Sequence, residues 1–426
     1  MVLSTGERLP MLMRRADGLP LFYPNVYAMA EVRGRDSASN TIEQALRAVM
    51  VLQLFLDAEG IDLQARLREG RFLERGEIEG LAQALRTPIE DLIKNAVAKS
   101  RKDAEVDGNV VSFDAVYARR KADRTTVGRT TSFIRGTYIR SYLMWLSTEY
   151  RQRLSVRDPA KALQLQQSAE FVDKSLLKRQ KKRGERNAVF RRKGLSAEAR
   201  ALLLEVIDPA CKRNPWKQAF ARKRNALAVR MLLLLGLRRG ELLNIRVEDV
   251  DFRQGRILIA RRPDDKTDTR ADQPLVKTAD RLLSLGPELL QEIKEYLAIR
   301  KMTGQARKHG YLFVASGTGA PLSLNGLNAL FATLRTKFPN VLMELTPHVL
   351  RHTWNDDFSD RCDIEKISPA EELRLRSYQM GWAYVSSNPE RPTTAEIYLR
   401  RRTEEKSGEL SLKNQAALRA KVKPTI

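Results

Sequence analysis

The chain has 426 residues, which is enough for two or three domains with separate cores. Its 76 lysines and arginines exceed its 52 acidic residues and give a formal net charge of +24 at pH 7, which indicates a polyanionic partner, nucleic acid first. The sequence has no long uncharged apolar span and no apolar h-region after Met1, so we expect no membrane partner and a cytoplasmic, nucleoid-associated location.

Cysteine and histidine are scarce. Cys211 and Cys362 lie far apart without CxxC spacing, which argues against a disulfide scaffold or a cysteine-rich zinc site and fits a reducing compartment. The three histidines, His309, His348 and His352, make a poor set of metal ligands. We therefore expect no bound metal and no cofactor.

The N-terminal part is predicted to be an arm followed by a helical domain. Residues 1–36 are mixed in character and predict an extended N-terminal arm. Residues 37–165 predict a helical DNA-binding domain, which opens with a capping box at Asn40–Glu43 and a helix that Gly60 can end. A second helix is expected around Ile78 to Leu85, and Thr87–Pro88 can start a third.

Aromatic and basic residues alternate in the strongest helix of this domain, from Phe133 to Leu146. Aromatic side chains at helical spacing usually belong to a core, and we interpret these in that way. The interleaved Arg135 and Arg140 are expected to contact DNA phosphates.

A basic stretch follows, and residues 166–194 are predicted to form a linker. Lys174 to Lys193 contains ten lysines or arginines and a single acid, Glu185, with little apolar periodicity. Such a run is commonly solvated and flexible, and in this position it can also follow a DNA backbone. The predicted DNA contacts in it are Lys178, Arg179, Lys181, Lys182 and Arg183.

A new apolar pattern begins at residue 195. Helices are expected at Ala219–Leu235, Pro287–Arg300 and Leu324–Phe338. Arg256–Ala260 predicts a strand, Gln273–Val276 predicts its returning edge strand, and the residues between them predict a hairpin tip.

The octapeptide Thr346–Thr353 is the most informative stretch of the chain. Thr346 can cap a helix whose first turn holds Pro347. His348 and Arg351 then lie one turn apart on the same face, and together they offer a proton carrier and a forked cation for a phosphate. The alternative is that both residues only decorate a capped surface helix.

Four further signals stand in chain order around this octapeptide. Arg238 lies in Gly-Leu-Arg-x-x-Glu-Leu, Lys266 lies on the predicted hairpin, and Trp382 and Tyr398 follow. With this ordered set the sequence resembles the tyrosine recombinase (phage integrase) family over about residues 195–402, and its helical domain looks like the core-binding domain of that family.

The resemblance implies a mainly α fold, with a helical, SAM-like core-binding domain and an α+β catalytic domain that contains a small antiparallel sheet. It also implies a role for each matching residue. Arg238 and Arg351 would clamp the phosphate, Lys266 would protonate the leaving 5′ oxygen, His348 would assist proton transfer, Trp382 would position the phosphate, and Tyr398 would be the nucleophile. Glu241 and His352 would support the site.

Two of these assignments have rivals in the sequence. The interval from Trp382 to Tyr398 is longer than the family usually has, and residues 386–392 resemble a loop insertion, which leaves Tyr384 as a second candidate nucleophile. Lys277 is the rival of Lys266, although it lies beyond Pro274.

The implied function is site-specific DNA recombination through a 3′-phosphotyrosyl intermediate, without metal or ATP, by four protomers on two DNA sites. A type IB topoisomerase and a degenerate DNA-binding accessory protein are the alternatives. The tail, residues 403–426, could dock on a neighbouring protomer or remain exposed. The target sequence, the direction of recombination and any accessory DNA-binding proteins are left open by the sequence.

Overall fold

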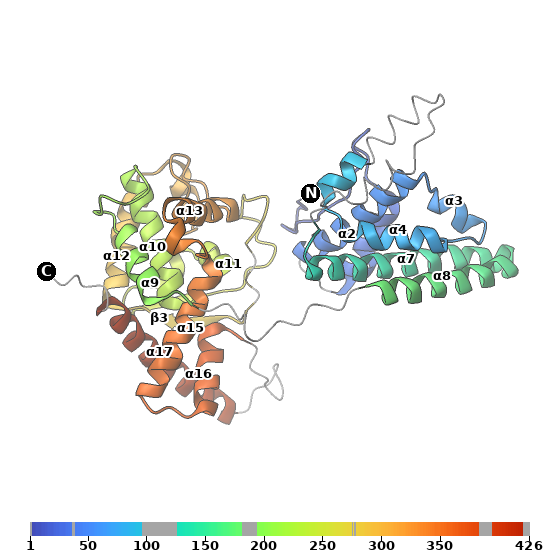
Figure 1. Cartoon of the computed structure of the whole chain (residues 1–426). Helices are drawn as coiled ribbons and strands as arrows, with labels where there is room; N and C mark the ends of the chain where they lie inside the picture. The colour runs from blue at the N-terminus through green and yellow to red at the C-terminus, as the bar shows by residue number, and fades with distance from the viewer. Residues whose placement is uncertain are drawn as a thin grey trace. The chain divides into compact units, whose positions relative to one another are not determined.

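The computed structural model describes residues 2–35, 39–95, 126–180, 194–274, 276, 278–382 and 394–420. The chain divides into two compact units (Figure 1). We call Leu9–Asn187 the helical unit, and Val2–Arg8 together with Ala188–Ile426 the C-terminal unit. Each unit has its own hydrophobic core.

From residue 22 onward the described secondary structure of the helical unit is helical, and residues 9–21 form an irregular segment with one antiparallel bridge between Met13 and Pro20. Its helices are α1 (Phe22–Tyr27), the π-helix η1 (Ala28–Val32), the 3-10 helix η2 (Arg33–Arg35), α2 (Ser39–Glu59), α3 (Leu63–Arg68), α4 (Arg75–Ala84), a helix over 89–95, α7 (Arg129–Arg157) and α8 (Pro159–Arg179). Helix α7 packs along both α8 and α2. As predicted, Gly60 ends α2, because its φ of +67° suits glycine.

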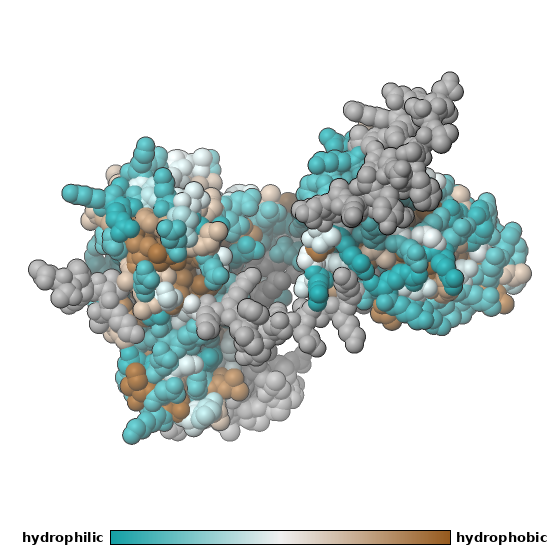
Figure 2. Space-filling view, in the orientation of Figure 1, coloured by the Kyte–Doolittle hydropathy of each residue, from teal (hydrophilic) through white to brown (hydrophobic). Residues whose placement is uncertain are grey.

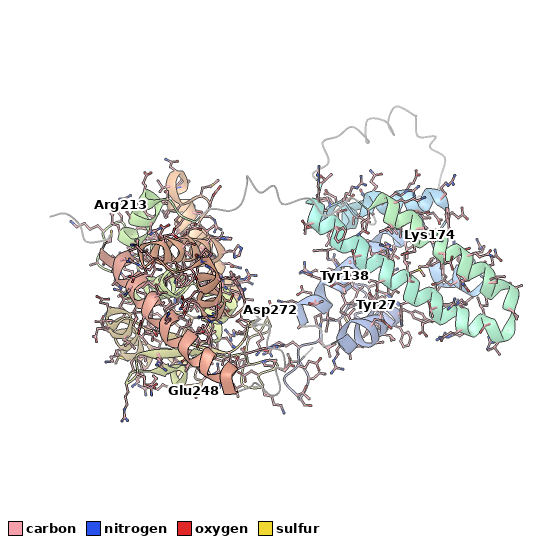
Figure 3. The ribbon with its side chains drawn as sticks, turned by 90° about the horizontal axis from the view of Figure 1, so that it is seen from below. Tyr27, Tyr138, Lys174, Arg213, Glu248 and Asp272 are labelled. Atoms are coloured by element: carbon pink, nitrogen blue, oxygen red, sulfur yellow. The ribbon has the colours of Figure 1, made fainter. Side chains whose placement is uncertain are left out.

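Most aromatic side chains of α7 lie in the core or pack against it, as predicted, and Phe133 is the exception. Tyr142 and Trp145 pack on Tyr27, with ring centroids 5.3 and 5.6 Å apart. Figure 3 labels Tyr27 and Tyr138 in this part of the unit. Hydrophilic side chains cover most of the face of the helical unit that Figure 2 shows.

Two predictions for this unit are wrong. Residues 22–35 are helical rather than an extended arm. The predicted linker begins too early, because α8 continues to Arg179 and buries Leu165, Ala169, Val172 and Leu176. These four residues recur at helical spacing, and lysine and arginine are good helix formers, so the basic composition did not end the helix. The later linker residues, 181–193, lie outside the described residues.

The C-terminal unit combines helices with a small antiparallel sheet. Its helices are α9 (Ala197–Val206), α10 (Ala219–Leu235), α11 (Arg239–Asn244), η4 (Val247–Asp249), α12 (Pro287–Arg300), η5 (Gly304–Lys308), α13 (Leu324–Lys337), α14 (Pro339–Leu342), α15 (Pro347–Ile364), α16 (Pro369–Met380) and α17 (Thr394–Ala420). The sheet has the order β1 (Val250–Asp251), β2 (Arg256–Ile259) and β3 (Arg281–Ser284). The predicted helices of this unit are confirmed within a residue or two, and α10 supplies the centre of the core.

The returning strand of the hairpin was predicted in the wrong place. The partner of β2 is β3, with Ile257 paired to Leu283, and not Gln273–Val276. Residues 260–280 therefore form one long connection between β2 and β3, which Asp272 marks in Figure 3. The guanidinium of Arg270 donates to the carbonyls of Leu243 and Leu322. These side-chain bonds hold the segment in place, so it does not need the backbone hydrogen bonds of a strand.

Helix α17 crosses the predicted boundary between the catalytic domain and the tail. It packs against α15 and α16 and beside β3. Leu410 and Leu418 are buried, so the alternative of an exposed tail is wrong, and in the single chain the tail packs on its own unit. Among the helices that the structure describes, none combines the length and the apolar character needed to span a bilayer.

Candidate active site

Glu241 lies at the centre of the candidate site. It is 1% exposed, and it belongs to α11 just after the turn that follows α10. Its carboxylate accepts hydrogen bonds from the backbone N–H of Arg238 at 2.9 Å, the hydroxyl of Thr278 at 2.7 Å and Nη2 of Arg281 at 3.0 Å. Burial opposes ionisation, but the charge of Arg281 and these donors outweigh it and lower the pKa of Glu241. Glu241 is therefore a buried anion that orders the cations around it.

Arg238 and Arg351 meet beside this carboxylate. The carbonyl oxygen of Met380 accepts from Nη1 of Arg238 at 3.4 Å and from Nη2 of Arg351 at 3.1 Å. Arg351 is 5% exposed and also donates to the carbonyl of Gly236 at 2.6 Å, whereas the side chain of Arg238 is 38% exposed. The structure thus brings the two predicted clamping arginines together, one buried and one open to solvent.

The electrostatics of this pair favour an anion. Burial, together with the nearby charge of Arg238, lowers the pKa of Arg351 to about 9. Glu241 is shared with Arg281, so its single charge faces three guanidiniums. An excess of buried positive charge with forked donors is the arrangement that a phosphate complements.

Two glycines allow the ends of α10 and α16 to pack closely against the side chains of the site. Gly236 ends α10 and Gly381 ends α16, each with φ of +62°. A Cβ on Gly236 would lie 2.7 Å from Cε of Met380, and one on Gly381 would lie 2.7 Å from Nη1 of Arg281. Both positions therefore require glycine for backbone conformation and for space.

His348 and Arg351 follow the predicted geometry of α15. Thr346 caps the helix and accepts from the N–H of Val349 at 3.2 Å, and Pro347 occupies the first turn. His348 is exposed, and its ring packs edge-on against His352 with centroids 4.4 Å apart. His352 therefore contacts the exposed imidazole of His348.

Trp382 follows the Gly381 turn. Its backbone N–H donates to the carbonyl of Ser377 at 2.9 Å, and its side chain is exposed. Because Met380 binds both arginines through its carbonyl, the chain leads directly from the arginine pair to this indole.

Lys266 is exposed on the long connection between β2 and β3. Its neighbour Asp265 accepts from the hydroxyl of Tyr311 at 2.7 Å and pairs with Arg246. A hairpin tip was expected here, but Lys266 lies in a longer connection that such side-chain contacts hold. Its rival Lys277 lies outside the described residues.

Tyr398 lies in the first turns of α17, and the structure does not describe the side chains of residues 394–402. Tyr384 and the predicted insertion at residues 386–392 lie outside the described residues. The choice between the two tyrosines stays a prediction.

Sequence reasoning missed three residues that hold this site. Thr278 and Arg281 bind Glu241, and the carbonyl of Gln379 accepts from Nε of Arg281 at 2.8 Å. The side chain of Gln379 in turn bonds to Ser407 and Ser411 of α17 at 2.9 and 3.2 Å. A buried arginine in a strand needs acceptors that are fixed around it, and the position of Arg281 in a strand appears only once β3 is placed correctly.

The predicted DNA contacts in the helical unit need correction. Arg135 is buried and donates to the carbonyls of Leu85 and Thr87, and Arg140 forms a paired contact with Asp173 at 2.8 and 3.0 Å. Both guanidiniums are used inside the unit, because an arginine on a packed helix face must find acceptors there.

The two basic residues at the end of α8 differ in their surroundings. Lys178 is exposed, whereas Arg179 bonds to Glu79 at 2.9 Å. Lys181, Lys182 and Arg183 lie outside the described residues.

Removing the central carboxylate is expected to destabilise the C-terminal unit. Glu241→Ala leaves Arg281 buried without its anion, and breaking a buried pair on one side costs about 3–5 kcal/mol. Hydrogen exchange of the α10 amides measures the loss, because they report opening of this core. The matched control is Glu248→Ala, whose carboxylate is exposed and pairs with Arg246, and it should cost about 0–1 kcal/mol. Equal losses in the two variants would contradict the central role of Glu241.

Residues 210–367 match the model of the phage integrase family. No match was found among curated proteins. Three solved structures were among the matches. A XerA recombinase is 20% identical over 68% of this chain and 96% of its own, with a TM-score of 0.33. A XerH site-specific recombinase bound to difH substrate is 16% identical over 94% and 98%, with a TM-score of 0.37. A Tn1549 transposon integrase bound to transposon right end DNA is 15% identical over 74% and 98%, with a TM-score of 0.33.

The family match covers most of the candidate site. Arg238, Lys266 and Arg351 lie within residues 210–367, whereas Trp382 and Tyr398 lie beyond them.

Proposed function

We propose, from the match of residues 210–367 to the phage integrase family, that the chain is a tyrosine recombinase that cleaves and rejoins duplex DNA at specific sites through a 3′-phosphotyrosyl intermediate. One observation carries the proposal. Arg238 and Arg351 share the carbonyl of Met380 beside the buried Glu241, in a part of the chain that the family model matches.

The proposed reaction is a transesterification at phosphorus. The phenol oxygen of Tyr398 forms a bond to the phosphorus, and the bond from phosphorus to the 5′ oxygen breaks. Arg238 and Arg351 hold the charge that develops on the non-bridging oxygens. Lys266 gives a proton to the departing 5′ oxygen, and His348 helps to take the phenol proton.

Rejoining reverses these steps with a different 5′ hydroxyl. That hydroxyl attacks the phosphotyrosine and releases Tyr398, so the energy of the phosphodiester is kept in the covalent intermediate. The reaction as written consumes no ATP and uses no metal. Four protomers on two DNA sites would complete both strand exchanges.

The experiment begins with DNA that flanks the chain's own gene. Incubation with the full-length protein, followed by denaturation, should leave protein covalently attached at one junction, which sequencing of the trapped ends maps. A plasmid with two copies of the mapped site should then recombine, whereas a plasmid with one copy should not. Relaxation of supercoiled DNA regardless of site would instead identify a type IB topoisomerase, and binding without any covalent product would identify an accessory protein.

The basic segment that begins in the last turn of α8 is expected to contribute contacts to the DNA backbone. Replacing Lys178, Arg179, Lys181, Lys182 and Arg183 by alanine should weaken binding to all sequences alike. Each lost phosphate contact should reduce the slope of log affinity against log salt by about 0.9. Because Arg179 already pairs with Glu79, it should contribute less than the exposed Lys178. Titrations at several salt concentrations measure the slope, and an unchanged slope would show that the segment does not touch DNA.

Trp382 is expected to donate its indole N–H to a phosphate oxygen. Trp382→His keeps an N–H donor and should remain active, whereas Trp382→Phe keeps bulk alone. A hydrogen bond to a charged group contributes about 1.5–3 kcal/mol, so the phenylalanine variant should cleave on the order of ten- to 100-fold more slowly. Single-turnover cleavage of the mapped site measures both. Full activity in Trp382→Phe would show that the side chain contributes only packing.

A further inference from the structure

The first residues of the chain form a small hairpin that packs in the C-terminal unit. Val2 and Arg8 make an antiparallel bridge, the N–H of Leu3 donates to the carbonyl of Glu7 at 2.8 Å, and the N–H of Gly6 donates to that of Leu3 at 2.9 Å. We call Val2–Arg8 the N-terminal hairpin. Its contacts assign it to the C-terminal unit, although the residues that follow it belong to the helical unit.

Arg8 binds the N-terminal hairpin to the connection between β2 and β3. It is 8% exposed, and its guanidinium donates to the carbonyls of Asp268 at 2.6 Å and Arg270 at 3.1 Å, and to Oε1 of Gln273 at 3.0 Å. A further bond, at 2.9 Å, reaches the carbonyl of Gly6 in the hairpin itself. These acceptors are neutral oxygens, and a buried cation is held by neutral oxygens only when several of them are fixed at once. Arg8 therefore stays in place only while the connection between β2 and β3 keeps its conformation, and Arg8 in turn stabilises that conformation.

The tip of the N-terminal hairpin lies against Lys266 itself. Gly6 has φ of +91°, and a Cβ on it would lie 2.2 Å from the carbonyl oxygen of Asp264 and 3.0 Å from Cγ of Lys266. The neighbouring residue Asp265 is held by Tyr311 and Arg246. The segment that carries Lys266 is thus held both by the N-terminal hairpin and by the contacts of Asp265, while Lys266 itself is exposed.

We propose that the N-terminal hairpin, through Arg8, positions Lys266 for proton transfer to the 5′ oxygen. This inference rests on the proposed function. A lysine has a long, flexible side chain, so its reach is defined by where the backbone holds its Cα. A displacement of about 1 Å far from the reacting atoms can cost on the order of 100-fold in rate. Arg8 touches no substrate in this role, and it acts as a positioning residue.

Replacing the leaving oxygen of the substrate by sulfur distinguishes a loss of positioning from a loss of folding stability. In a substrate with sulfur at the 5′ bridging position, the leaving group departs readily without a proton, because a thiol is far more acidic than an alcohol. A defect that acts through Lys266 should then largely disappear. A defect caused by loosened folding should persist.

The test compares Arg8→Gln with the parent in the full chain, by single-turnover cleavage of the mapped site with oxygen or sulfur at the 5′ position. We expect a loss on the order of ten- to 100-fold on the oxygen substrate and nearly parental cleavage of the sulfur substrate. Arg14→Gln is the matched control, because Arg14 is an exposed arginine that pairs with Asp17, and it should cleave both substrates like the parent. The double variant Arg8→Gln/Lys266→Ala should be no slower than Lys266→Ala alone, since both act on one step.

Two other results would overturn the inference. One is parental cleavage of the oxygen substrate by Arg8→Gln, and the other is an equal loss on both substrates. Gly6→Ala provides a second variant if Arg8→Gln does not fold, because it pushes on the same backbone from the hairpin side, and it should show the same rescue by sulfur. If Lys266→Ala itself loses equally on both substrates, the proposed proton transfer fails, whatever the hairpin variants do.

Discussion

Tyr398→Phe is expected to abolish the covalent protein–DNA product and to leave DNA binding nearly unchanged. Phenylalanine keeps the ring and removes only the hydroxyl whose oxygen attacks phosphorus. The residue lies in the first turns of α17, a helix fixed to α16 by the bonds of Ser407 and Ser411 with Gln379. Tyr398 therefore belongs to a helix that is anchored in the C-terminal unit.

Denaturing gels of protein incubated with the mapped site measure the covalent product, and gel shifts measure binding. Tyr384→Phe is the matched control, since it removes the same hydroxyl from the rival tyrosine, and it should form the covalent product like the parent. An active Tyr398→Phe together with an inactive Tyr384→Phe would transfer the nucleophile assignment to Tyr384.

Lys266→Ala is expected to slow cleavage far more than it weakens binding. General acid catalysis contributes about 100- to 10,000-fold, and the loss on the oxygen substrate should fall in that range. On the substrate with sulfur at the 5′ position, Lys266→Ala should cleave nearly as fast as the parent. Single-turnover rates on the two substrates give the comparison.

Arg351→Ala is the reference for this experiment. Arg351 is proposed to hold non-bridging oxygens, which are the same in both substrates, so its variant should remain defective on both. If Lys266→Ala showed an equal deficit on the two substrates, Lys266 would only neutralise charge. The acid would then have to be sought at His348 or at a water molecule.

Local patterns in the sequence determined most of the helices of the C-terminal unit. Helix α10 covers the predicted residues because an unbroken apolar run ends at Gly236, which can adopt the left-handed conformation. Thr346 and Pro347 likewise identified the start of α15, because the groups that cap a helix lie within a few residues of its end. Signals of this kind need no knowledge of the rest of the fold.

Predictions failed where a residue's contact partners lie far along the chain. Gln273–Val276 has the composition of an edge strand, but a strand is defined by its neighbour, and β2 pairs with β3 instead. Arg135 and Arg140 have the side chain of a phosphate ligand, but their acceptors, the carbonyl of Thr87 and the carboxylate of Asp173, lie elsewhere in the same unit.

By itself the sequence determined the residue types of the site, their order along the chain and the helix faces that carry them. The tertiary structure alone decided that Arg238 and Arg351 share one carbonyl, that Arg281 balances Glu241, and that the N-terminal hairpin lies against Lys266. The physical reason is that each of these contacts joins residues far apart in sequence. Burial and the need of each buried charge for fixed partners select such pairs only after the chain has folded.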